Sequence, residues 1–250
     1  MNKLATFFYI ALGICIGSEN LVITYKYHTH LQTQLGSFQA GQNIIQVTYN
    51  NNSLTDIGPK NQSEIHLISQ STITNKFIKS FYSIEDSISM HMYANMSLIS
   101  IYKSIKEKRK PLKIYSSIIN QDSIAYTKIV DTVKTLRKIK APTESVYDAL
   151  GIIFSFQNCS FTQSSEYNFN EYRKGKIKPL TLGVINEEIA VSPYGNSNCI
   201  VLSSNPENNS IDKGDIKIWI SKQEEDWGIP IKVETQTKNG LLTLLLESIE

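Results

Sequence analysis

The segment LVITYKYHTHL, residues 21–31, decides the fold class of this protein. One side of the segment carries every second residue: Leu21, Ile23, Tyr25, Tyr27, Thr29 and Leu31. The polar residues Thr24, Lys26, His28, His30 and Gln32 occupy the positions between them. A two-residue period is typical of a β-strand, because successive side chains point to opposite faces of a sheet. The segment therefore predicts a strand with one buried face.

The same alternation recurs along the chain. After Gly36 it resumes at Ile45, Val47 and Tyr49, which predicts a hairpin with the first strand. Further alternating segments cover residues 65–71, 84–94, 98–105, 112–118, 216–220 and 229–233. Asn239-Gly240 then joins the last of these to residues 241–246, and Asn-Gly is a strong hairpin signal. The pattern predicts a mainly β protein: a single large twisted antiparallel sheet or an open β-barrel.

One segment follows a helical period. Its apolar residues are spaced three or four apart and form a stripe of Val146, Leu150, Ile153 and Phe154. Pro142 and Thr143, followed by Glu144, are typical start signals. We therefore expect one α-helix, at about residues 143–157, to pack on the sheet through this stripe.

Composition restricts the class of protein further. The chain has 250 residues, of which 41% are hydrophobic and 19% charged, which excludes a disordered chain and a polytopic membrane protein. No Pro-rich or Gly-rich linker divides it, so residues 19–250 are expected to form a single β-rich domain. The net charge is only +2, from 25 Lys and Arg against 23 Asp and Glu. This balance gives no reason to expect a nucleic-acid partner.

The N-terminus has the layout of a secretory signal. Lys3 precedes an apolar run from residue 4 to 16, and the small residues Gly17 and Ser18 follow. As a helix this run would span about 20 Å, less than the ~30 Å hydrocarbon core of a membrane. Residues 1–18 are therefore predicted to be a signal peptide, and the protein is expected to be extracytoplasmic.

Two products of export are compatible with the sequence. Cleavage after Gly17 gives a soluble periplasmic protein, whereas lipid attachment at Cys15 gives an outer-membrane lipoprotein. The bulky, β-branched Ile14 favours the first, because lipoprotein signals usually place a small residue before the cysteine. A membrane contact is expected only through a lipid anchor at Cys15.

Two cysteines remain after Cys15 is removed, and the sequence allows two interpretations of them. Cys159 and Cys199 can form a disulfide in an oxidising compartment. They can equally be isolated small hydrophobic residues.

Residues with catalytic or metal-binding chemistry are sparse. His28 and His30 point to the same side of a strand and could supply two zinc ligands, but the sequence places no third ligand beside them. The chain has no Gly-x-Ser-x-Gly elbow, no Gly-rich phosphate loop and no His-Glu-x-x-His motif. No catalytic residue, metal site or cofactor is predicted.

Aromatic residues are frequent, with 13 Tyr, 9 Phe and 2 Trp. On a curved sheet they could line an apolar hollow for an acyl chain or a peptide. In the simpler interpretation they fill the space between the sheet and the helix.

Three stretches together resemble an uncharacterised family of bacterial exported proteins, domain of unknown function 3108. They are LGSFQAG at residues 35–41, YDALG followed by IIF at residues 147–154, and residues 218–242 with Trp219, Pro230 and Gly240. Gly151 stands where the family usually has Ser, and Gln157 where it often has Arg. The resemblance implies an extracytoplasmic, mostly antiparallel β protein of unassigned role.

We expect structural roles for Tyr147, Asp148, Leu150, Trp219, Pro230 and Gly240. Asp148 in particular should be at least partly buried, because it lies on a helix that packs on the sheet. A buried carboxylate needs partners, so Asp148 should accept hydrogen bonds from backbone amides or from a basic side chain.

The sequence thus favours an exported, non-enzymatic protein of the cell envelope. It would bind an apolar or peptide-like ligand on the concave face of its sheet, or act as a scaffold for an envelope protein. The alternative is a hydrolase of envelope glycans or lipids, which would require a cluster of titratable groups in one pocket.

The signal predicts a processed N-terminus. N-terminal sequencing of the protein from its native host should begin near Ser18 or Glu19, and an intact Met1 would contradict export through this signal. A lipid-modified Cys15 would instead establish the lipoprotein alternative.

Overall fold

The computed structural model describes residues 20–34, 36–50, 64–76, 84–107, 110–159, 161, 165–205, 214–224, 226–237 and 240–250. The predicted signal peptide with Cys15 and the turn residue Asn239 lie outside these residues. No helix in the described part is long and apolar enough to span a membrane.

The described residues form fifteen strands in one sheet. In chain order these are β1 (Leu21–Thr33), β2 (Gly36–Tyr49), β3 (Glu64–Ile73), β4 (Ile84–Tyr93), β5 (Leu98–Glu107), β6 (Lys113–Ile119), β7 (Ser123–Val130), β8 (Val133–Lys140), β9 (Val146–Tyr147), β10 (Glu166–Arg173), β11 (Lys176–Ser192), β12 (Gly195–Ser203), β13 (Ile216–Ser221), β14 (Pro230–Thr237) and β15 (Gly240–Ile249).

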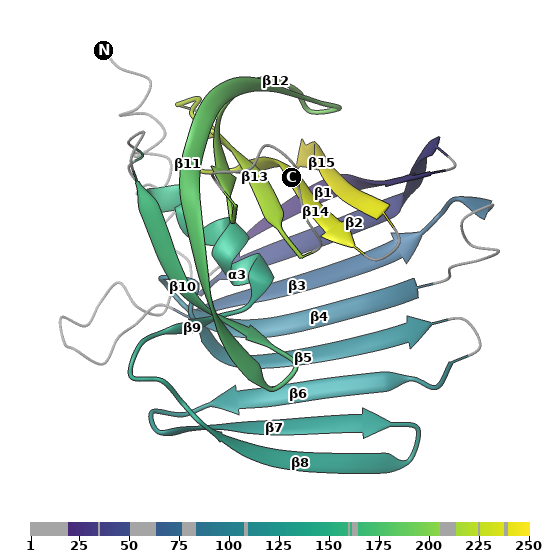
Figure 1. Ribbon diagram of the computed structural model, residues 1–250, viewed down its shortest axis with the longest axis vertical. Helices are drawn as coiled ribbons and strands as arrows, with labels where there is room; N and C mark the ends of the chain where they lie inside the picture. The colour runs from purple at the N-terminus through teal and green to yellow at the C-terminus, as the bar shows by residue number, and fades with distance from the viewer. Residues whose placement is uncertain are drawn as a thin grey trace.

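The strand order consists of two meanders joined at their first and last strands. It runs from β8 back to β1, continues with β15, and then runs back to β9 (Figure 1). Neighbouring strands are antiparallel except for the two-residue β9, which pairs in parallel with β10. The prediction of a single large, open and mainly antiparallel sheet is confirmed.

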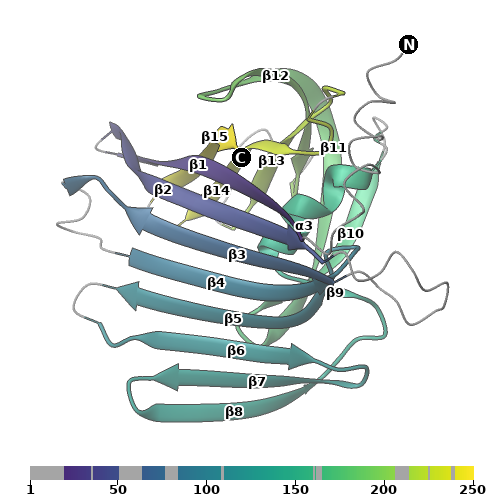
Figure 2. The same ribbon diagram turned by 180° about the vertical axis from the view of Figure 1, so that it is seen from behind.

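The sheet curls so that β1–β8 and β10–β15 face each other across the interior (Figures 1 and 2). The helix α3 (Ala149–Phe154) lies between the two halves, on the concave side. Tyr25 of β1 packs on Phe154 with ring centroids 5.0 Å apart, so the face that carries Tyr25 is the concave face. The alternation of residues 21–31 thus sets which side of the sheet forms the core.

The predicted helix at residues 143–157 is wrong in its extent. Only α3 is α-helical; a 3₁₀ turn (Ser155–Asn158) follows it, and Val146 and Tyr147 form β9 instead. The helix begins at Asp148, whose side chain caps it, because the β-branched and aromatic pair before Asp148 adds to the edge of β10.

The helix and the turn after it nevertheless supply apolar side chains that fill the interior. Ile152, Ile153 and Phe154 are buried, and so is Phe156 in the turn. Phe156 packs edge-on against Tyr167 and Phe169, with ring centroids 5.2 Å and 5.9 Å away. Aromatic side chains thus fill the concave face beside α3, as the simpler interpretation of their number predicted.

Gly151 departs from the family pattern for a steric reason. A Cβ atom at this position would lie 2.7 Å from the carbonyl oxygen of Met96, closer than two such atoms can approach. Serine at this position would therefore push α3 away from the connection between β4 and β5.

Phe154→Ala should lower the free energy of unfolding by about 3–5 kcal/mol, the usual cost of removing a buried aromatic ring. Its side chain is 1% exposed, whereas Ile189, a matched control on β11, is 63% exposed. Ile189→Ala should change stability by no more than about 0.5 kcal/mol. Urea unfolding compares the two, and an equal midpoint for both variants would contradict the placement of α3 in the core.

Candidate functional site

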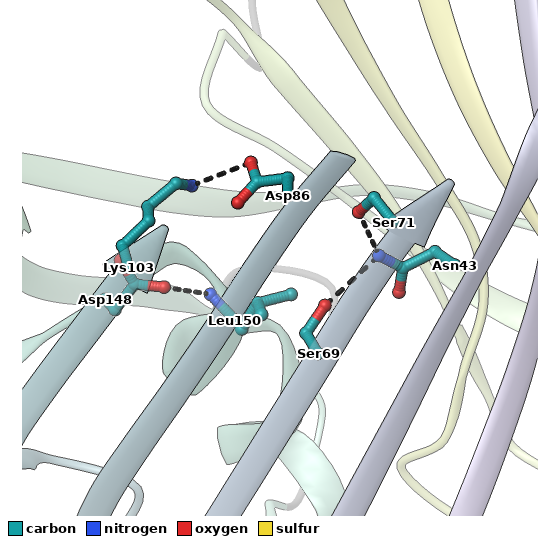
Figure 3. Close-up of polar contacts among 7 residues, drawn as sticks. All are labelled: Asn43, Ser69, Ser71, Asp86, Lys103, Asp148 and Leu150. Carbon is teal, nitrogen blue, oxygen red and sulfur yellow. Dashed lines mark hydrogen bonds and ion pairs between the residues drawn. The ribbon is translucent and has the colours of Figure 1, made fainter. Parts of the chain in front are cut away.

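On the buried face of the sheet, the strand register places several polar residues next to one another. Across the sheet, Tyr25 lies beside Ile45, and the row continues through Ser69, Ile88, Lys103 and Tyr115. A second row contains Tyr27, Asn43, Ser71 and Asp86. Side chains that are directly opposite on paired strands share a face, so these polar residues lie on the concave side. We call Asn43, Ser69, Ser71, Asp86 and Lys103 the inner polar site (Figure 3).

Asn43 is the most buried member, with 7% of its surface exposed. Its Nδ2 donates to the hydroxyl oxygens of Ser69, at 3.1 Å, and of Ser71, at 2.6 Å. Its Oδ1 is buried and has no hydrogen-bond partner in the described part of the chain. A buried acceptor without a partner costs about 1–3 kcal/mol, which makes it a candidate contact for a ligand.

Asp86 and Lys103 form an ion pair in the same site. Nζ of Lys103 lies 3.3 Å from Oδ2 of Asp86, and both side chains are largely buried (Figure 3). The second oxygen of Asp86, Oδ1, is buried without a partner among the described residues. The site therefore holds two unsatisfied acceptors and one cation.

Asp148 lies next to this site, where it caps α3. Its Oδ1 accepts a hydrogen bond from the amide of Leu150 at 3.1 Å (Figure 3). Burial raises the pKa of the Asp148 carboxyl, and the amides of Leu150 and Ala149 and the charges of Lys103 and Arg173 act in the opposite direction. The expectation of partial burial with amide partners is confirmed.

A hairpin tip covers part of the concave face. Residues 172–176, the end of β10, the turn after it and the first residue of β11, form what we call the clasp. Tyr172 shares a 2.6 Å hydrogen bond with Ser117 of β6, and Lys174 lies 5.6 Å from the ring centre of Tyr115. Gly175, with φ of +76°, sits so close to the ring of Tyr126 that its Cβ would be 3.1 Å away. The clasp thus ties one half of the sheet to β6 and β7 of the other half.

Basic side chains collect where the clasp meets β5–β8. Six basic side chains lie either at inward-facing positions of β5 to β8 or on the clasp. We call them the basic surface: Lys103, Lys113, Lys128, Arg137, Arg173 and Lys174. Lys113 pairs with Glu107 at 3.0 Å, and hydrogen bonds from Lys110 and then Lys113 lower the pKa of that carboxyl to about 2. The four remaining cations after Lys103 and Lys113 form no ion pair with any described residue.

The electrostatics of Lys174 reflect this excess of positive charge. Burial lowers the pKa of its ammonium group, and the charges of Arg173, Lys103 and Lys113 lower it further. Only Asp86 acts in the opposite direction. Cations held together in this way are stabilised by a bound anion.

A separate pocket of about 420 Å³ lies on the outer face of the sheet. It contains Trp219, whose indole N–H donates to Glu188 and whose ring lies 4.1 Å below the ammonium of Lys232. Lys232 also pairs with Glu234 at 2.7 Å. Both carboxylates are thus already held by neighbouring side chains, as in a structural network.

Gln157 is held between the buried Tyr25 and the partly buried Tyr49. Its Nε2 donates to the hydroxyl of Tyr25 at 3.1 Å, and its Oε1 accepts from the hydroxyl of Tyr49 at 3.0 Å. Arginine, which the family often has here, could not accept the second bond because it has no acceptor. The departure at this position is therefore matched to its surroundings.

The other residues singled out in the sequence are dispersed. Pro230 is buried, and its carbonyl accepts from the hydroxyl of Tyr27 at 2.9 Å. Gly240 has φ of +133°, and a Cβ there would lie 2.0 Å from the carbonyl oxygen of Gln32. Tyr147 packs edge-on against Phe169, 5.2 Å away. These contacts hold strands and the helix together and form no common site.

The cysteines and histidines are placed apart from the inner polar site. Cys159 and Cys199 are both free thiols. They form no disulfide and correspond to the second alternative, isolated small hydrophobic residues. His28 lies 3.0 Å from Glu247, whereas His66 and His91 stack with ring centroids 4.5 Å apart. Within the described residues, no three His, Cys, Asp or Glu side chains converge in a way that could hold a metal ion.

These features define a class of protein: a single curled, open β-sheet with a short helix inside it and a polar, basic patch on its concave face. The chain belongs to the family described as "Protein of unknown function (DUF3108)", whose sequence profile matches residues 25–247. A search of curated proteins found no match.

Two solved structures were found to be similar to this chain. A β-barrel-like protein of domain of unknown function DUF1849 from Brucella abortus aligns with a TM-score of 0.51 at 5% identity, over 94% of this chain and 99% of that one. A protein from Parabacteroides distasonis ATCC 8503, proposed to be a lipoprotein, aligns with a TM-score of 0.30 at 11% identity, over 93% and 96% of the two chains. The first similarity shows a shared fold and nothing about ligands.

The sequence analysis did not single out the inner polar site, although a signal for it exists. Asn43 is in phase with Ile45 and Val47, and Asp86 is in phase with Ile88 and Met90. A polar residue at a position that the alternation assigns to the core is unusual, because burial of a polar group is costly. A search for polar residues at positions that the alternation assigns to the core would have identified Asn43 and Asp86.

Asp148→Asn should leave the free energy of unfolding unchanged or raise it at neutral pH. The amide oxygen still caps α3, and the charge that burial disfavours is gone. Because the folded-state pKa of Asp148 is raised, its protonation favours the folded state below the ordinary value of 3.8, and this contribution is lost as pH rises through the folded value.

Urea midpoints of both proteins at neutral pH and below pH 3.8 test this reasoning. Any advantage of the Asn variant should appear at neutral pH and vanish in acid. Asp148→Ala, which lacks the cap, should lose about 0.5–2 kcal/mol. A large loss for Asp148→Asn at neutral pH would show that the carboxylate gains more from Lys103 and Arg173 than burial costs it.

Proposed function

We propose that this protein is an exported, non-enzymatic component of the cell envelope that binds an anionic ligand on the concave face of its sheet. The ligand would contact the basic surface and the inner polar site. Export follows from the signal-like layout of residues 1–18, and the envelope location follows from export and from the family resemblance.

The observation that carries the proposal is the excess of unpaired cations on a concave face. Lys128, Arg137, Arg173 and Lys174 form no ion pair with the described residues. Cations at the rim of a concave surface attract anions and can donate several charge-assisted hydrogen bonds to one phosphate or carboxylate.

The inner polar site adds a second requirement for the ligand. The Oδ1 atoms of Asn43 and Asp86 are acceptors without a partner in the described chain. They would be satisfied by hydroxyl or amine groups next to the negative charge. An anion that also carries hydroxyls, such as a glycerol phosphate or the headgroup of an anionic lipid, has both properties.

An apolar ligand is less well supported by the geometry. The apolar part of the concave face is occupied by Phe154 and Phe156, which pack on Tyr25 and on Tyr167. A ligand on this side of the sheet therefore meets polar and basic groups first.

Two probes test the proposal and separate a soluble ligand from a membrane lipid. Calorimetric titration measures the affinity for glycerol 1-phosphate, and sedimentation measures binding to vesicles that contain phosphatidylglycerol, with phosphatidylcholine vesicles as the control. Arg173→Gln/Lys174→Gln should weaken binding of the preferred probe by at least about tenfold, since one charged hydrogen bond is worth about 1.5–3 kcal/mol.

Lys106→Gln/Lys178→Gln is the matched control, because it removes the same charge from exposed residues of β5 and β11 outside the basic surface. It should leave the affinity unchanged. Equal weakening in both double variants would show that the affinity depends only on net charge, which would contradict a specific binding site on the basic surface. Absence of binding to either probe would contradict the proposed ligand class.

A further inference from the structure

The strand β8 ends the sheet and pairs on one side only. Eight consecutive register pairs join it to β7, from Ser123 opposite Lys140 to Val130 opposite Val133, without a bulge. No strand in the described part of the chain lies on its other side. An edge strand leaves about half of its backbone N–H and C=O groups without a partner in the sheet. At the opposite end of the sheet, β9 has only two residues.

All charged residues of β8 are basic. Its sequence, VKTLRKIK, has four basic residues and no acidic residue. Two apolar side chains on it are largely exposed, Val133 at 67% and Leu136 at 66%. Charged side chains, lysine above all, protect an edge from neutral or basic strands. The same charges attract an acidic strand.

Two other occupants fit β8 less well. A second copy of the chain, paired through its own β8, would place four cations of each copy beside four of the other. An anionic membrane would neutralise the lysines but offers no regular array of backbone donors and acceptors to pair with the edge. An acidic extended segment satisfies both the charges and the backbone.

We propose that β8 is a docking strand for an acidic, extended segment of a partner protein, which adds to the sheet by backbone pairing. Backbone hydrogen bonds along the edge supply the affinity. Lys134, Lys138 and Lys140 share one face of β8 and select acidic side chains on that face of the added strand. Val133, on the opposite face of β8, contacts its apolar side chains, and Leu136 lies between the lysines. This surface is separate from the clasp and does not depend on the proposed anionic ligand.

The test uses an eight-residue peptide that alternates glutamate with valine, labelled with a fluorophore, and a control peptide with lysine in place of glutamate. Fluorescence anisotropy measures binding to the purified protein, and hydrogen exchange measures protection of the amides in residues 133–140. The acidic peptide should bind and slow exchange in β8, whereas the basic peptide should do neither.

Charge-neutral variants locate the interaction. Lys134→Gln/Lys138→Gln should weaken binding of the acidic peptide by about tenfold, as expected for two surface charge pairs of up to about 1 kcal/mol each. Lys106→Gln/Lys178→Gln, with the same change in net charge, should bind like the unmodified protein. Arg173→Gln/Lys174→Gln should also bind the peptide normally, which separates this site from the clasp.

Three outcomes would overturn the proposal. Binding of the acidic peptide without slower exchange in β8 would show adhesion through charge alone. Equal weakening by both lysine pairs would show a response to net charge. Binding of anionic vesicles that depends on Lys134 and Lys138, with no binding of the acidic peptide, would identify a membrane-contact edge instead.

Discussion

The pairing of β1 with β15 holds the rest of the structure together. It joins the N-terminal meander, β1 to β8, to the C-terminal one, β9 to β15, over register pairs from Tyr25 opposite Ile249 to Gln32 opposite Leu241. Thr24 and Glu250 exchange two backbone hydrogen bonds of 2.7 Å and 2.9 Å, and Lys26 pairs with the Glu250 side chain. Without this contact the sheet would separate into two smaller sheets with four edges. The contact links residues more than 200 positions apart, so it can form only after most of the chain has been made.

The curl of the joined sheet creates an interior with two different parts. Near α3, Phe154 and Phe156 fill the space and bury the apolar rows. In the next inward row across β2, β3 and β4, the same inward positions carry Asn43, Ser71 and Asp86 in place of apolar residues. The clasp adds Arg173 and Lys174 from the opposite half of the sheet. The basic surface is therefore complete only where these two distant segments meet across the curl.

Much of the fold could be predicted from periodicity, and the failures have identifiable causes. The strands β1 to β6 and β13 to β15 alternate apolar and polar residues clearly, because one of their faces is buried. Strands β7, β8, β10 and β11 were missed, since their exposed and charged positions, such as those of VKTLRKIK in β8, weaken the alternation. Strand β12 was missed for another reason: residues 199–203 are all buried, so its sequence does not alternate. The helix was placed correctly but made too long, because Val146 satisfies the helical spacing and a two-residue edge strand equally well. The disulfide alternative could not be decided, because sequence spacing carries no information on the distance between Cys159 and Cys199.

The sequence by itself determined the kind of secondary structure, the buried face of most strands and the presence of one helix beside Asp148. These depend on local periodicity and on capping, which act over a few residues. Only the tertiary structure decided that β1 closes onto β15, that Lys103, Arg173 and Lys174 share one concave face, and that β8 ends the sheet with no described strand on its outer side. These features depend on which distant strands pair and in which register, and no local pattern specifies that choice.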